Sequence, residues 1–398
     1  RHFMRKNNIS KILLSCTGLF SFIATGCDFN INVGVDNDLI LSEACHGSQN
    51  IYVELYNTSD KDVKLDGYSL RFYREPDDYS VITLSGTIKG NSTYVIAKND
   101  STAACTEYAD LVTADLRITG YQPIALVKGR LIQDIIGDNK KDPVNYFADA
   151  CIVRKKEAEF CKPTTNFDEY SWVRYTQYDL SHMGKFDDVI SNADLLAGPK
   201  LESSQIGGDY LKEVTDANGT KRTLGTGNAV PVTLAACVDG DTSYFKFSNE
   251  VKAAIEATGS YSGGTKNNGL RVRYQNINTK ESTTRVEEGG VPAKKFVNNL
   301  LEKSSSLYVQ SIKDGQLFET FGRLIAWVWT DQNTLLNFEV VKAGHSEVSF
   351  SAIENMSYKG VTYTNFMYNA DLYAQKNKLG LYGQNDPYWD YEHNQPIS

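Results

Sequence analysis

Short alternating segments separated by turn residues fill the first half of the chain and restrict its fold most strongly. Apolar and polar residues alternate in residues 51–56 (IYVELY) and 67–72 (GYSLRF), and a third such segment, residues 93–97 (TYVIA), follows Gly90 and Asn91. A period of two places one face of a strand in the core, and Gly, Asn and Asp permit tight turns between strands. Residues 39–182 are therefore predicted to form a β-sandwich.

The order of landmarks in this region resembles the lamin-tail domain family. The landmarks are LSE (41–43), VELYN (53–57), LDGYSL (65–70), QPIAL (122–126), and a late Phe167-Asp168 with Trp172. The resemblance implies an immunoglobulin-like fold and a role in recognition or spacing, without catalysis. It does not identify a ligand, because a shared fold does not imply a shared partner.

The length of 398 residues suggests two or three domains. Residues 183–228 are polar and are interrupted by glycine at 207–208, 216–219 (DANG) and 225–227, so they are predicted to form a linker carrying one hairpin. A second domain is expected at residues 229–392. The net charge of −8 argues against a protein that coats nucleic acid non-specifically, because such affinity needs many Lys and Arg, but it allows a locally basic cleft.

The first 26 residues have the pattern of a targeting segment. Arg5 and Lys6 precede an apolar run from residue 12 to residue 24, and Cys27 follows small residues (ATG, 24–26). This pattern resembles a bacterial lipoprotein signal, with Cys27 lipidated and residues 27–38 forming a tether. The alternatives are an ordinary cleaved signal or an uncleaved anchor. Each places the remaining chain outside the cytoplasm, and the lipoprotein interpretation places it on the extracellular face of the bacterial membrane.

Five cysteines remain after Cys16 and Cys27 are set aside. Cys45 with Cys105, and Cys151 with Cys161, are plausible pairs, although spacing does not determine connectivity. Cys237 lies in an apolar segment and is predicted to be a buried thiol. The chain has no CxxC pair and only five histidines, which argues against a zinc site.

An ordered series of charged residues marks the second domain. It comprises VDGDT (238–242), Arg273 followed by NTKE (278–281), and FGR (321–323). Two arginines, an acidic pair and a glutamate suit phosphodiester cleavage, in which guanidinium groups and a metal hold phosphoryl oxygens while a carboxylate activates water. In an extended run, Asp239 and Asp241 would face the same side and favour a hard cation such as Ca²⁺ or Mg²⁺. The alternatives are an Asp-Gly turn with solvated acids, an ordinary turn after a surface strand, and an exposed strand arginine.

The series resembles the thermonuclease, or staphylococcal-nuclease-like, family over residues 229–383. The resemblance implies an OB-type barrel with helices, built from strands near 230–238, 244–247, 270–277, 306–312 and 324–329 and helices near 292–301, 333–343 and 368–379. It also implies Ca²⁺ and site roles for this chain: Arg273 and Arg323 bind phosphate, Glu281 activates water, Asp241, Asn278 and Thr279 contact the metal, and Asp239 supports them. His345 is expected to be structural.

Two departures from the family pattern affect the expected chemistry. Asn278 stands where the family usually has aspartate, which removes one negative charge from the metal ligands and predicts weaker or altered metal binding. Lys280 replaces the usual proline. The segment between Thr242 and Arg273 is also longer than usual, with glycines at 259, 263, 264 and 269.

Taken together, the sequence predicts a mainly β, two-domain protein that acts as a surface-anchored, metal-dependent nuclease on DNA, with RNA as a second candidate substrate. Ca²⁺ is the expected ion, and Mg²⁺ or another divalent ion is the alternative. Competing hypotheses are a weakened nuclease-fold module that binds nucleic acid or a surface partner, and an adhesin in which the lamin-tail-like domain binds an unknown ligand. Membrane contact would come from the lipid on Cys27.

Overall fold

The computed structural model describes residues 38–141, 144–349 and 355–397. The predicted signal segment (1–26), Cys27 and nearly all of the tether lie outside these residues, so their roles stay predictions. Within the described ranges, no helix combines the length and the apolar character that crossing a bilayer requires.

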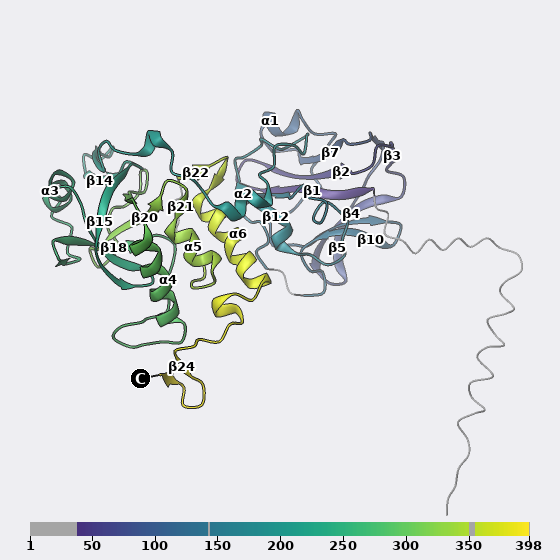
Figure 1. Cartoon of the computed structure of the whole chain (residues 1–398). Coiled ribbons are helices and arrows are strands. Elements are labelled where there is room, and N and C mark those ends of the chain that lie inside the picture. Colours follow the sequence, from purple (N-terminus) through teal and green to yellow (C-terminus); the bar gives the residue numbers. More distant parts are fainter. Residues whose placement is uncertain (1–37, 142–143, 350–354, 398) are drawn as a thin grey trace, which may run out of the picture. The chain divides into compact units, whose positions relative to one another are not determined.

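The first β-rich region is a sandwich of two sheets (Figure 1). One sheet has the order β12-β11-β1-β2-β7-β8 and the other has the order β10-β9-β4-β5. Apolar residues of both sheets, including Leu41, Leu55, Leu70 and Leu126, are fully buried in a shared core. The predicted sandwich is therefore confirmed. Its strands are β1 Leu39–His46, β2 Ile51–Asn57, β4 Tyr68–Glu75, β5 Asp78–Thr83, β7 Thr93–Lys98, β8 Leu111–Thr113, β9 Ile124–Lys128, β10 Leu131–Ile136, β11 Ala150–Arg154 and β12 Trp172–Thr176.

The disulfide in this region joins Cys45 to Cys151. The pairings suggested from sequence, Cys45 with Cys105 and Cys151 with Cys161, are therefore wrong. The reason is strand order: β1 and β11 are antiparallel neighbours, and Cys45 lies directly opposite Cys151 in their register. Cys105, Cys161 and Cys237 are free thiols.

The segment from residue 183 to residue 228 contains short elements. Helix α2 (Asn192–Ala197) and the 3₁₀ turn η2 (Ser203–Gln205) precede the hairpin of β13 (Leu211–Thr215) and β14 (Lys221–Gly225). The single hairpin predicted from sequence is present. The domain boundaries themselves stay predictions.

The second domain is a β-barrel built from five principal strands. These are β15 Ala229–Asp239, β16 Thr242–Lys246, β18 Gly269–Tyr274, β19 Leu307–Gln310 and β20 Leu324–Asp331. The sheet runs β17-β18-β16-β15-β19-β20-β21, and a further parallel pairing of β18 with β20 closes it. In that closing ladder Arg273 is opposite Ile325, so β18 and the start of β20 lie side by side.

Four helices accompany the barrel: α3 Asn249–Ala257, α4 Gly290–Lys303, α5 Leu336–Lys342 and α6 Tyr363–Lys376. The last three correspond to the expected helices, and α4 packs on β15. Helix α3 was not expected, because its residues belong to the segment interpreted as extra loop. Ser248 caps it by accepting a hydrogen bond from the Val251 N–H.

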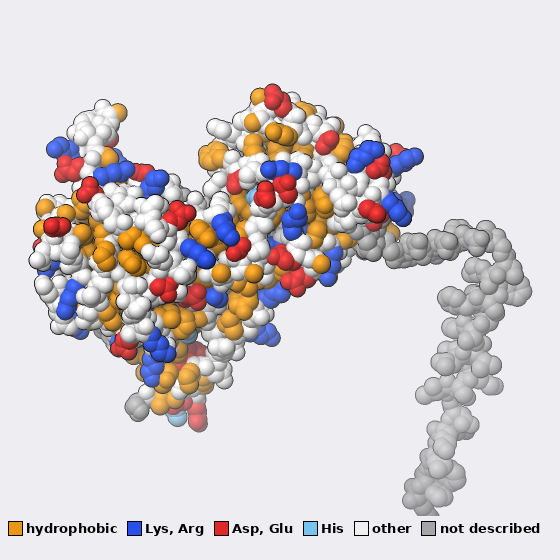
Figure 2. Space-filling view, turned by 45° about the horizontal axis from the view of Figure 1, so that its top comes forward, with side chains coloured by type: hydrophobic (Ala, Val, Ile, Leu, Met, Phe, Trp, Pro, Cys, Tyr) orange, Lys and Arg blue, Asp and Glu red, His pale blue; other side chains and the backbone are white. Residues whose placement is uncertain are grey.

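Short elements complete the described fold. They are β3 Val63–Lys64, β6 Thr87–Ile88, α1 Ala103–Thr106, η1 Glu169–Ser171, β17 Thr265–Lys266, β21 Thr334–Leu335, β22 Ser357–Tyr358, β23 Val361–Thr362, η3 Gly380–Tyr382, β24 Trp389–Asp390 and β25 Gln395–Pro396. Acidic and basic side chains are interspersed on the face shown in Figure 2. This face shows no broad basic surface of the kind that coats nucleic acid, as the net charge of −8 suggests.

Candidate active site at the open face of the barrel

The turn between β15 and β16 places two aspartates at one end of the barrel. Strand β15 ends at Asp239 and β16 begins at Thr242, so Gly240 and Asp241 form a tight turn. The run is therefore not extended beyond Asp239, and the Asp-Gly turn considered as the alternative is present. Neither carboxylate is solvated as in an ordinary surface turn, however, because both aspartates are buried.

Gly240 explains how this turn is buried. A Cβ atom added there would lie 2.8 Å from atoms of the Thr279 side chain and 2.9 Å from the Cβ of Ala293 on α4. Real side chains do not tolerate such distances, so glycine permits the turn to pack against the segment that follows β18 and against α4.

Asp239 binds the loop that carries Glu281. Its Oδ1 accepts a hydrogen bond from the Ser282 hydroxyl (2.7 Å), and its Oδ2 accepts one from the Ser282 N–H (3.3 Å). These bonds fix the position of residue 282 relative to the β15–β16 turn. Asp239 therefore orients the backbone next to the proposed general base.

Asp241 connects the same turn to Arg273. Its Oδ2 accepts the Thr279 N–H (2.9 Å) and pairs with the Nη1 of Arg273 (2.8 Å). The Nη2 of Arg273 donates to the Oδ1 of Asn278 (2.8 Å). Asp241, Arg273 and Asn278 are thus one bonded unit. Burial lowers the pKa of Arg273, and the charge of Asp241 opposes that effect.

Glu281 is exposed at the edge of this unit. The pKa of its carboxyl is raised, by burial of the carboxyl first and then by a hydrogen bond with Asp239 and the charges of Asp239 and Asp241. A carboxylate whose proton affinity is increased by its neighbours is better suited to accept a proton from water than an isolated one. This position agrees with the role predicted for Glu281.

Arg323 reaches the same place from the start of β20. Its Nε pairs with the Oε1 of Glu319 (2.9 Å), and its backbone N–H donates to the same oxygen (3.1 Å). Burial alone would raise the pKa of Glu319, but the hydrogen bonds and the charge of Arg323 outweigh it and lower that pKa. The closing β18–β20 ladder brings Arg323 near Arg273 although fifty positions separate them in sequence.

Side chains from these segments line a single hollow of about 150 Å³. Of the seven barrel residues predicted from sequence, six line it, and Thr279 is the exception because its side chain is buried behind the turn. The lining residues are Val238, Asp239, Asp241, Thr242, Arg271, Arg273, Asn278, Glu281, Thr283 and Arg323.

Sequence reasoning missed several residues that shape the site. Ser282 and Glu319 hold predicted residues in place, and Arg271 adds a third guanidinium to the lining of the hollow. Glu319 could have been found from its spacing of four residues before Arg323. Arg271 could have been found from strand alternation, since residues 271 and 273 face the same side of β18. Nothing local marks Ser282.

The oxygen atoms at this hollow fit a hard divalent cation, although weakly. The described residues contain no group of three or more His, Cys, Asp or Glu side chains suited to hold a metal. Two aspartates and the Asn278 amide nevertheless provide oxygen ligands that line the hollow. Ca²⁺ takes six to eight oxygen ligands, so bound water would have to complete such a site.

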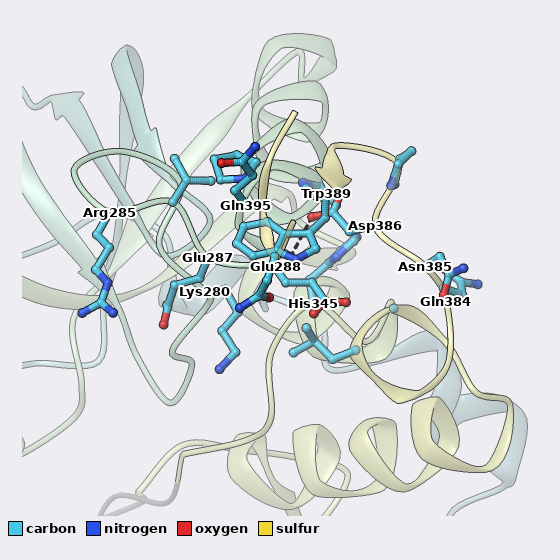
Figure 3. A pocket seen from close by; sticks show the side chains of 18 of the residues that line it. Lys280, Arg285, Glu287, Glu288, His345, Gln384, Asn385, Asp386, Trp389 and Gln395 are labelled. Atoms are coloured by element: carbon cyan, nitrogen blue, oxygen red, sulfur yellow. Dashed lines mark hydrogen bonds between the residues drawn. The ribbon is translucent and has the colours of Figure 1, made fainter. Parts of the chain in front are cut away.

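A second, larger cavity of about 690 Å³ lies beside the site (Figure 3). Lys280, Arg285, Glu287 and Glu288 line it from the loop before α4, and Trp389 and Gln395 line it from the C-terminal tail. Neither Arg273 nor Arg323 lines it, so it is separate from the hollow described above. His345 also lines it, and the centre of its ring lies 4.8 Å from that of Phe296, with the two rings tilted by 50°. Burial lowers the pKa of His345, in keeping with a structural role.

Comparison with known proteins agrees with both halves of this description. Residues 34–138 match the family model of the lamin tail domain, and residues 271–384 match that of the staphylococcal nuclease homologue. No curated protein matches the chain. The structure adds β15 and β16 to the barrel ahead of the matched residues, together with the two aspartates of their turn. The chain therefore carries a lamin tail domain and, after it, a staphylococcal nuclease homologue domain.

Proposed function

We propose that the barrel domain is a metal-dependent nuclease that hydrolyses phosphodiester bonds of DNA and also accepts RNA. The observation that carries this proposal is the shared hollow lined by Arg273, Arg323 and Glu281. Two guanidinium groups can bind the oxygens of one phosphate, and a carboxylate beside them can take the proton of an attacking water. The match to the staphylococcal nuclease homologue supports a nuclease fold.

Arg273 would act by exchanging partners, whereas Arg323 would keep the partner of its Nε. Arg273 is bonded to Asp241 and Asn278, and the Nε of Arg323 is bonded to Glu319. A phosphate entering the hollow competes for Arg273 with these oxygens, while the terminal nitrogens of Arg323 can donate to it without loss of the Glu319 bond. Both guanidinium groups then stabilise the charge that develops on the phosphoryl oxygens.

Asp241, Asn278 and the Thr279 carbonyl would hold the metal, with Asp239 as a further oxygen ligand or as support for the turn. Ca²⁺ is the proposed ion, with Mg²⁺ or another divalent ion as the alternative. When bound, such an ion offsets phosphate charge and lowers the pKa of its bound water. Glu281 would act as the general base that accepts the proton of the attacking water.

The lipoprotein-like signal motivates the proposal of where the nuclease works. A lipid on Cys27 would tether the chain to the outer face of the bacterial membrane, and the lamin tail domain would hold the nuclease away from the bilayer or bind an unknown partner. Cleavage of host or environmental nucleic acid would then supply nucleotides. Labelling with a radioactive fatty acid that is lost on Cys27→Ser would support the tether, and unchanged labelling would contradict it.

The experiment that tests the nuclease proposal measures cleavage of single- and double-stranded DNA, and of RNA, by the full chain with Ca²⁺, with Mg²⁺ or with chelator. Glu281→Gln should lower the cleavage rate by about 10²–10⁴-fold, the usual contribution of a positioned general base. Glu250→Gln on α3, an exposed acid of the same domain, is the matched control and should cleave normally. Unchanged cleavage by a folded Glu281→Gln variant would refute the assigned role.

A second candidate function is a module that binds nucleic acid without cutting it. Asn278 favours this candidate, because the metal ligands lose a negative charge there. Retention of Glu281, Arg273 and Arg323 favours cleavage. Tight DNA binding with no cleavage under any divalent ion would select the second candidate.

A further inference from the structure

The C-terminal tail, residues 384–397, contacts the loop that carries Glu281. This loop, residues 281–289, runs from the proposed general base to the start of α4. All but the first residue of the tail lie beyond the match to the staphylococcal nuclease homologue, which ends at residue 384. Figure 3 shows side chains of both segments lining the larger cavity, Glu287 and Glu288 from the loop and Asp386 and Trp389 from the tail.

Two hydrogen bonds between Glu281 and Glu287 fold the loop back on itself. The Glu287 N–H donates to the Glu281 carbonyl (2.8 Å), and the Glu281 N–H donates to the Oε2 of Glu287 (3.0 Å). Gly290 passes close to this contact, since an added Cβ there would lie 2.1 Å from the Glu281 carbonyl oxygen. The backbone of Glu281 is therefore positioned through Glu287 and the start of α4.

The N-terminus of α4 has no capping side chain at its own N-cap position. The residue at the N-cap position of α4 is Gly289, which makes no side-chain capping bond. The Gly289 N–H donates instead to the Oδ2 of Asp386 (2.8 Å), whose residue is only 6 % exposed. A carboxylate at this end of a helix also interacts favourably with the helix dipole. Asp386 thus binds from the tail the N-cap N–H that the N3 carboxylate binds in a capping box.

Two further contacts hold the tail against the loop and α4. The Tyr391 hydroxyl donates to the Oε1 of Glu288 (2.7 Å) and accepts the Asp386 N–H (2.7 Å). The Nζ of Lys295 on α4 lies 3.8 Å from the centre of the Tyr388 ring. The tail therefore binds the loop at two consecutive residues, 288 and 289. It also contacts the adjoining helix, α4, at Lys295.

We propose that Asp386 is a positioning residue for the nuclease site, acting through Gly289 and Glu287 on the backbone of Glu281. The tail serves as a clasp that keeps the 281–289 loop in the conformation needed for catalysis. Asp386 does not touch the hollow where the phosphate would bind, so its loss should affect turnover more than substrate affinity. This last expectation rests on the proposed nuclease function, whereas the clasp itself does not.

The test compares Asp386→Ala with Asp390→Ala in the full chain. Asp390 lies in the same tail but pairs with His393 of its own hairpin, so it is a matched control. Asp386→Ala should increase hydrogen exchange of amides 281–290 about tenfold, and it should lower kcat about tenfold with KM changed less than twofold, since loss of a helix cap has effects of this order. Asp386→Asn retains one acceptor oxygen and should restore part of both properties.

Several outcomes would overturn the proposal that the tail acts as a clasp. These are unchanged exchange at residues 281–290 in Asp386→Ala, equal effects of Asp390→Ala, or exchange that rises uniformly over the whole chain with a lower Tm. If the parent chain cleaves no nucleic acid, the proposed function fails, but the exchange measurement still decides whether the tail holds the loop.

Discussion

The lamin tail domain and the nuclease-like barrel each contain an arginine–aspartate pair, and the two pairs differ in what surrounds them. In the sandwich, Arg154 and Asp134 lie 2.6 Å apart, with side chains 1 % and 0 % exposed. In the barrel, Arg273 and Asp241 lie 2.8 Å apart, with side chains 15 % and 11 % exposed. The chemistry of the two pairs is the same, but only the second opens into a hollow.

The remaining bonds of each pair explain the difference. Arg154 also donates to the carbonyls of Leu41, Phe160 and Lys162, and Asp134 also accepts the N–H groups of Leu41 and Thr164. These partners are fixed backbone groups, which cannot be exchanged for a ligand. Arg273 donates to one backbone carbonyl, that of Asp241, and is otherwise bonded to the side chains of Asp241 and Asn278, which line the hollow. A closed pair stabilises a fold, whereas an open pair can release its arginine to a substrate.

The largest expected loss of stability comes from removing the arginine of the closed pair, Arg154 and Asp134. Arg154→Met leaves Asp134 buried without its cation, which should lower the free energy of unfolding by about 3–5 kcal/mol. Arg74→Met is the control, because Arg74 pairs with Asp78 at the surface and its loss should change stability little. Denaturant unfolding measures both variants. Equal, small losses of unfolding free energy in the two variants would show that burial of the Arg154–Asp134 pair does not matter for stability.

For the open pair, Arg273 and Asp241, we expect a large loss of cleavage activity and a smaller loss of stability. Arg273→Met should lower the rate of DNA cleavage about 10²–10³-fold, equivalent to about 3–4 kcal/mol, because a guanidinium that binds the reacting phosphate is lost. Its effect on unfolding should be smaller than that of Arg154→Met, because the side chains of Arg273 and Asp241 are 15 % and 11 % exposed, whereas those of Arg154 and Asp134 are 1 % and 0 % exposed. Arg222→Met, at an exposed pair of the β13–β14 hairpin, is the control for cleavage. A large loss of stability with normal cleavage per folded molecule would contradict the comparison.

A third prediction concerns a buried carboxylate of the sandwich that has no arginine. Burial, opposed by hydrogen bonds from Ser42 and the Gly184 N–H, raises the pKa of Glu54 to about 7. The folded state therefore holds the proton more tightly than the unfolded chain. The resulting stability is fully present below the ordinary carboxyl pKa and is lost as the pH rises through 7.

Between pH 4.5 and pH 7.5 this change should amount to about 2–3 kcal/mol. Glu54→Gln should reduce the dependence of the unfolding free energy on pH, with the remainder coming from the neighbouring Glu43, whose pKa is also raised by burial and by the charge of Glu54, and Glu75→Gln at the exposed end of β4 should leave it unchanged. Thermal unfolding across this range measures the effect. A parent protein whose stability rises toward pH 7.5, relative to Glu54→Gln, would show the opposite sign.

The smallest expected effect concerns the charge of the open site. Asn278→Asp adds a carboxylate to the proposed metal ligands and should increase Ca²⁺ affinity about tenfold, measured by calorimetry. Asn299→Asp on α4 makes the same change at an exposed position and should not alter affinity. New cleavage activity in Asn278→Asp, from an inactive parent, would identify the natural chain as a weakened nuclease. Unchanged affinity would remove Asn278 from the metal ligands.

Local patterns in the sequence predict the strands and the motif residues, because both depend on near neighbours. Alternation located β2, β4 and β7, and the NTKE and FGR motifs located the hollow. The disulfide could not be predicted, because Cys45 meets Cys151 only through the order of β1 and β11. The contact between Gly289 and Asp386 joins residues 97 positions apart, in a tail without periodicity. Helix α3 was missed for a different reason, since its capping serine was visible but its segment was interpreted as loop.

The parallel pairing of β18 with β20 also determines when the hollow is completed during synthesis. A nascent chain that has not yet docked residues 324–326 on β18 already contains both aspartates, Arg273 and Glu281, but Arg323 is not yet beside them. Contacts between segments so distant in sequence form slowly relative to local ones. For the proposed nuclease, activity would therefore arise only after the last principal strand of the barrel has paired.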